Sequence, residues 1–139
     1  MNMKLTITGA LALLAAQTAF AHHSFSAEFD VNKPVTLHGT LTKMEWVNPH
    51  GWVHIDVRQP DGTIVSWAIE AGAPNGLLRR GLRKTDFPAG IELVVTGFQA
   101  KNGTRTANGR SVTLPDGRDF FLGSSGTGEP KDGAEREER

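Results

Sequence analysis

The chain contains no cysteine among its 139 residues. Disulfides, thiolate metal sites and cysteine-based redox chemistry are therefore excluded, and the fold depends on apolar burial or on a metal bound by other ligands. Acidic and basic residues number 15 each, so the chain lacks the positive field typical of a nucleic-acid binder. A Ser/His/Asp pattern, a phosphate-binding loop and a zinc-hydrolase motif are also missing, which argues against an enzyme.

Residues 1–21 have the pattern of a secretory signal peptide. A short basic start ending at Lys4 precedes an apolar run over 5–16, and Ala19-Phe20-Ala21 has the small-x-small form of a cleavage site. The run is shorter than the ~20 residues that a membrane span needs. We predict cleavage after Ala21 and a periplasmic product without a transmembrane segment, with an uncleaved N-terminal anchor as the alternative. The remaining 118 residues (22–139) suit one domain.

Alternating apolar and polar residues predict a chain made mostly of strands. The strands are expected at 35–47, 52–58, 63–70, 91–98, 110–114 and 118–122, with a short helix at 77–80. The apolar phase of the first strand slips between Gly39 and Lys43, which predicts a bulge or bend there. Gly81 is placed to end the helix in a left-handed conformation, and Leu82 could pack back on its last turn.

Three strands, a helix and two further strands follow the order of an OB-type barrel. We therefore predict an all-β domain with one short helix, an OB-like five-stranded barrel (β-β-β-α-β-β), with an open β-sandwich as the alternative. In this scheme residues 22–34 are an irregular N-terminal arm and residues 35–123 form the barrel domain. Residues 124–139 have no apolar residue to bury, so we expect a disordered polar tail.

Several motifs along the chain resemble one family of small exported bacterial proteins. They include His22-His23-Ser24-Phe25, Glu45-Trp46-x-Asn48-Pro49-His50, Leu78-Arg79-Arg80-Gly81 and Asp116-Gly117-Arg118. This combination is similar to the family grouped as domain of unknown function 6152. Leu82 and Ile91 depart from its pattern at loop and packing positions. The resemblance implies export and a small β-domain, and it implies no particular activity.

The histidines suggest a metal site. Cleavage after Ala21 would expose an α-amine on His22 that can chelate a metal together with its own imidazole, and His23 adds a second imidazole. Such nitrogen ligands favour copper, in the manner of a histidine brace. His50 and His54 are the candidate distant partners, although an extended strand would hold them ~13 Å apart. The alternative is that the N-terminal histidines are solvent-exposed, His50 caps a turn and His54 is a solvent-facing strand residue.

A second candidate surface lies on the strand expected at 52–58. Trp52, His54 and Asp56 share its outer face, where a periplasmic or membrane protein could dock. Glu45, Asp56 and Glu70 could pair for acid–base chemistry, but their spacing does not demand it. The sequence therefore favours a non-enzymatic periplasmic binding module, with copper or a similar metal ion as its candidate ligand and a protein-interaction subunit as the alternative function.

Overall fold

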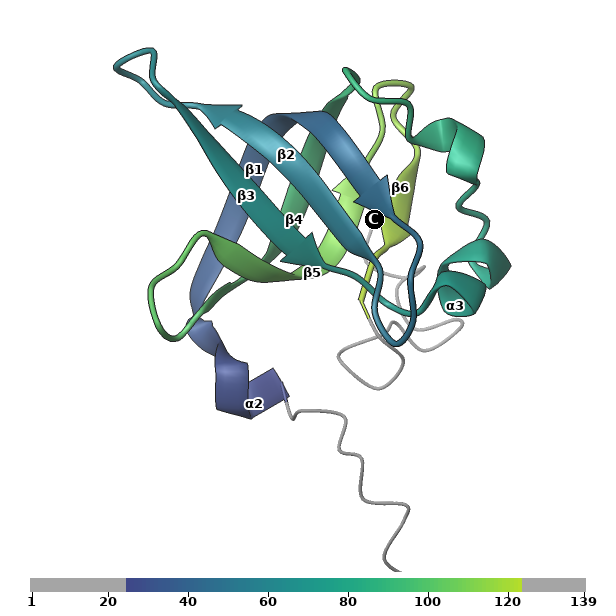
Figure 1. Cartoon of the computed structure of the whole chain (residues 1–139), viewed down its shortest axis with the longest axis horizontal. Coiled ribbons are helices and arrows are strands. Elements are labelled where there is room, and N and C mark those ends of the chain that lie inside the picture. The colour runs from purple at the N-terminus through teal and green to yellow at the C-terminus, as the bar shows by residue number, and fades with distance from the viewer. Residues whose placement is uncertain (1–24, 124–139) are drawn as a thin grey trace, which may run out of the picture.

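The structure is a computed structural model, and it describes residues 25–123 (Figure 1). A short helix precedes three strands, a second helix and a 3-10 turn follow, and three more strands complete the domain. The elements are α2 (Phe25–Glu28), β1 (Phe29–Glu45), β2 (Trp52–Arg58), β3 (Ile64–Glu70), α3 (Pro74–Arg79), the 3-10 turn Lys84–Asp86, β4 (Glu92–Ala100), β5 (Thr106–Thr113) and β6 (Asp119–Phe121).

Five of the strands form a closed ring. Neighbours pair in the order β3-β2-β1-β4-β5, and a parallel pairing of β3 with β5 closes the ring. All other pairings are antiparallel. The short strand β6 pairs with the last residues of β5, on the edge of β5 that faces away from β4. The helix α3 lies between β3 and β4 in the chain. The predicted all-β fold with one short helix in the third connection is confirmed.

The long first strand serves both halves of the ring. Its later part pairs with β2 and its earlier part with β4, and the two ladders overlap at Thr40. The register of the β1–β2 ladder shifts between Leu41 and Lys43. The predicted bulge is therefore confirmed: Leu41 and Lys43 pair with the consecutive residues Ile55 and His54, which leaves one extra residue in β1.

Two sequence-based boundaries were wrong. The described part of the predicted irregular arm at 22–34 is regular: residues 25–28 form α2, and β1 begins at Phe29, whose side chain is buried and whose backbone pairs with Ala100. The strand expected at 110–114 begins earlier, because β5 starts at Thr106. Glycine and asparagine usually signal a loop, but here Gly109 and Gly97 lie opposite each other where β4 and β5 approach closely.

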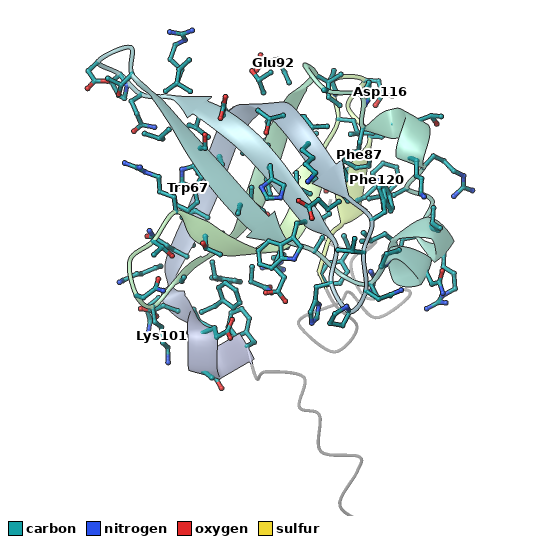
Figure 2. All side chains as sticks on the ribbon, viewed as in Figure 1. Trp67, Phe87, Glu92, Lys101, Asp116 and Phe120 are labelled. Carbon is teal, nitrogen blue, oxygen red and sulfur yellow. The ribbon has the colours of Figure 1, made fainter. Side chains whose placement is uncertain are left out.

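The core fills the ring and extends under α3. Leu77 on α3 and Leu82 behind it are fully buried with residues of all five strands. Gly81 has φ +97°, and the Leu82 amide donates to the Leu77 carbonyl, as predicted for this helix end. Trp67 packs against the core from β3 (Figure 2). No helix within residues 25–123 is long and apolar enough to cross a membrane.

Candidate functional site

The candidate site is a row of polar and aromatic side chains on the outer surface of β1, β2 and β3. Val53 and Ile55 are fully buried in the core, so the alternate residues of β2 face outward. Trp52 pairs with Glu45 on one side and with Glu70 on the other. Directly paired residues share a face, so these three side chains lie in one row across three strands.

A histidine and a buried carboxylate meet at one end of this row. The Nδ1 atom of His50 lies 3.4 Å from Oε1 of Glu70, and the two side chains are 14% and 3% exposed. Glu70 points away from the core, since Ile69 before it is a core residue. A carboxylate so removed from water needs a charged or hydrogen-bonding partner, and His50 supplies one.

Glycines fix the position of the loop that carries His50. The Gly51 amide donates to the Gly72 carbonyl at 3.1 Å, and the Ala71 amide donates to the Gly51 carbonyl at 2.8 Å. A β-carbon at Gly51 would lie 3.2 Å from the Glu45 carbonyl oxygen. The β1–β2 loop is therefore tied to the chain just after Glu70, and this brings His50 onto that carboxylate.

A second histidine–carboxylate pair lies on the other side of Trp52. Nε2 of His54 is covered from solvent and lies 3.2 Å from Oε1 of Glu45. Lys43 contacts the same carboxylate oxygen at 2.7 Å. A hydrogen bond from Lys43 lowers the pKa of Glu45, and the charges of Lys43 and His54 act in the same direction. Glu45 therefore stays ionised and favours a cation beside it.

Asp56 belongs to a different part of the surface. Its carboxylate accepts a 2.6 Å hydrogen bond from the Ser66 hydroxyl. It lines a hollow of about 500 Å³ together with His38, Thr40, Arg58, Ile64 and Glu92. Figure 2 shows Glu92 at the end of the sheet away from Lys101 and α2. Trp52 and Asp56 share a strand face, as expected, but they have different neighbours.

The predicted metal ligands are only partly covered by the structure. His22 and His23 lie outside the described residues. His50 and His54 contact different carboxylates, on opposite sides of Trp52. Within residues 25–123 no three His, Asp or Glu side chains come together in a way that could hold a metal ion.

Glu70 was considered from sequence only as an acid–base candidate, and its contact with His50 was missed. Its phase, opposite to that of Trp67 and Ile69, indicates an outward-facing side chain but not its burial or its contact with the loop. Arg80, which was not among the predicted site residues, is half-buried. Its guanidinium donates to the Gly123 carbonyl at 3.0 Å and lies 4.9 Å from the Phe121 ring centre.

One family model matches most of the chain. Residues 10–109 match the model described as Family of unknown function (DUF6152). The chain belongs to this family. The DUF6152 match spans the row of Glu45, Trp52 and Glu70 and the loop that carries His50, and it confirms the resemblance seen in the motifs. No curated protein and no solved structure matches this DUF6152 chain.

Proposed function

We propose that this DUF6152 protein is a non-enzymatic binding module, exported to the periplasm by residues 1–21, that binds copper or a similar ion. The observation that carries the proposal is the contact of His50 with the buried carboxylate of Glu70. A histidine that ligates a metal usually donates its other ring N–H to a carboxylate, which fixes the ring and raises its basicity. With Nδ1 directed at Glu70, the coordinating atom of His50 would be Nε2.

The chain before Phe25 is long enough to bring further nitrogen ligands to this pair. The Phe25 ring packs edge-on against Phe98 on β4, with ring centres 5.7 Å apart. Phe98 pairs with Asn108 on β5, and Asn108 pairs with Glu70 on β3. Two strand spacings, about 10 Å, therefore separate Phe98 from Glu70.

His22 lies three positions before Phe25, and an extended chain covers about 10 Å in that length. A terminus cleaved after Ala21 could thus place the α-amine and imidazole of His22 beside His50. His23 is the further imidazole candidate of this site, whereas His54 lies against Glu45 on the other side of Trp52. An amine and two imidazoles form a nitrogen donor set that Cu(II) binds in preference to Zn(II).

The test is a Cu(II) titration of protein produced by export, monitored by calorimetry and EPR. We expect N-terminal sequencing to begin at His22 and one Cu(II) to give a nitrogen-rich type-2 spectrum. Inserting Ala before His22, or changing His50→Gln, should weaken binding at least ~10-fold. His38→Gln is the matched control, because His38 is exposed in the distant hollow. Binding weaker than micromolar in the processed protein would exclude a specific site.

Docking of a periplasmic or membrane protein is the second candidate function. It is favoured by Trp52, which is half-buried in the middle of the polar row, since aromatic residues are enriched at protein interfaces. A partner that co-purifies from native membranes with the wild-type protein and is lost in Trp52→Ala would support docking. Retention of that partner by Trp52→Ala would exclude this face.

A further inference from the structure

One edge of β3 is only half covered. On one side β3 pairs with β2 over its full length, from Ile64 to Glu70. On the other side it pairs with β5 only from Ala68 onward. Figure 1 shows the β2–β3 hairpin extending out of the ring at this end. Within residues 25–123, no strand pairs with the outer edge of Ile64–Trp67.

The backbone groups on this edge are correctly directed for a further strand. The Ala68 amide donates to the Arg105 carbonyl at 3.1 Å, on the side away from β2. Backbone N–H and C=O groups of alternate residues in a strand point to the same side. The amides and carbonyls of Ile64 and Ser66 therefore also point away from β2, into the open edge.

This edge lacks the features that usually prevent strand addition. The sequence Ile64-Val65-Ser66-Trp67 has no charge, no proline and no bulge, and the Ile64 side chain is 56% exposed. By contrast, the stretch of β1 between Phe29 and Pro34 has charged residues, a proline and a register shift. Natural proteins protect their edge strands with such features. The outer edge of Ile64–Trp67 therefore resembles a strand edge that pairs with another strand rather than one protected from pairing.

We propose that the β3 edge pairs antiparallel with the same edge of a second copy of this chain, forming a symmetric dimer. The two-fold axis would pass at Val65, so that Ile64 lies opposite Ser66 of the second copy, and Ser66 opposite its Ile64. Each of these two pairs would exchange both of its N–H···O bonds. Such an isologous contact closes after two copies and leaves no further edge to extend.

The symmetry of this edge favours a second copy over an unrelated strand. The outward amides and carbonyls of the open stretch belong to Ile64 and Ser66, which lie one residue to each side of Val65. A two-fold axis through Val65 therefore pairs the same four backbone groups on both copies at once. The nearest charged side chains, Asp56 and Arg58 on β2, would lie three strand spacings, roughly 14 Å, from their counterparts in the second copy, so their mutual effect is screened.

The contact is small, so the dimer should be weak and reversible. Stable complexes bury about 1,200–2,000 Å² in total, whereas smaller contacts belong to transient assemblies. A pairing of four residues per copy falls in the second class. We therefore expect a dissociation constant between about 10 µM and 1 mM, corresponding to roughly −7 to −4 kcal/mol.

The test is sedimentation velocity of the mature chain over that concentration range, without added metal. Ile64→Lys places a charge on the edge, and Val47→Lys is its matched control at an exposed apolar residue outside β3. Ser66→Pro removes an edge amide without removing a β2–β3 hydrogen bond. Ser66→Ala is its control, because it loses only the hydroxyl contact with Asp56.

We expect the wild type and both controls to dimerise alike, and Ile64→Lys and Ser66→Pro to raise the dissociation constant at least ~10-fold. Circular dichroism identifies any variant that fails to fold, and if Ser66→Pro does so, Ile64→Lys decides alone. Monomeric wild-type protein at 1 mM would overturn the proposal, as would a dimer unchanged by Ile64→Lys. The result does not depend on copper binding, since the His50–Glu70 pair lies at the opposite end of β3.

Discussion

Adding one methyl group at two different glycines should change stability in opposite directions. Gly97 lies where β4 crosses β5, and a β-carbon there would overlap the carbonyl oxygen of Asn108. Asn108 is the β5 residue that pairs with Glu70, so this close approach holds β5 in place to close the ring beside the candidate site. Gly76 lies in α3, and its nearest neighbour would be the Arg80 guanidinium at 3.6 Å, an ordinary contact.

Gly97→Ala should lower the free energy of unfolding by about 3 kcal/mol. Inserting a methylene into a packed region typically costs ~1–3 kcal/mol, and a backbone carbonyl cannot rotate away as a side chain can. Gly76→Ala should raise the free energy of unfolding by about 0.5–1 kcal/mol, because alanine is the better helix former. The two variants should therefore differ by roughly 4 kcal/mol, and the melting temperature of Gly97→Ala should fall by roughly 10 °C.

Urea unfolding followed by circular dichroism measures both free energies. Gly76→Ala is the matched control, since it adds the same methyl group to the same chain. A Gly97→Ala free energy within ~0.5 kcal/mol of wild type would refute the close approach of β4 and β5. A Gly76→Ala variant as unstable as Gly97→Ala would show that alanine is tolerated poorly for a reason unrelated to ring closure.

Three further outcomes are expected. A hydrogen bond from Arg118 lowers the pKa of Asp86, so this carboxylate stabilises the fold above about pH 4, and that contribution is lost as the pH falls through its lowered pKa. Asp86→Asn should thus lower the urea midpoint at pH 7 and match the wild type in strong acid. Leu77→Ala should lower the free energy of unfolding by about 2–5 kcal/mol, because the Leu77 side chain of α3 is fully buried in the core. Phe25→Ala should weaken Cu(II) binding roughly 10-fold while leaving the melting temperature nearly unchanged, since it removes the Phe25–Phe98 contact from which the proposed N-terminal ligands would extend toward Glu70. Equal affinity in calorimetry would argue against that route.

The parts of the fold that depend on local patterns could be predicted. Alternation of apolar residues predicted the strands, the phase slip before Lys43 predicted the bulge, and Gly81 predicted the end of α3. Contacts between distant segments could not be read in this way. Residues 106–109 are polar or small, and only their position between β3 and β4 makes them strand residues.

The candidate site shows the same division. The strands predicted at 35–47 and 52–58 leave residues 48–51 as the connection that carries His50. The partner of His50 is Glu70, which belongs to another strand and is buried because the β1–β2 loop is bonded to the backbone at Ala71 and Gly72. Burial of an outward-facing carboxylate by a neighbouring loop leaves no periodic trace in a single sequence.

The double role of β1 has a consequence for how the chain folds as it emerges from a ribosome or an export channel. β1, β2 and β3 appear first and can pair as a meander, but the early half of β1 has no partner until β4 follows. The outer edge of β3 remains unpaired until β5, which follows β4 in the chain, has been made. The cooperative unit is therefore almost the entire domain, and fragments that end before Thr106 should remain unfolded and prone to associate through unpaired edges.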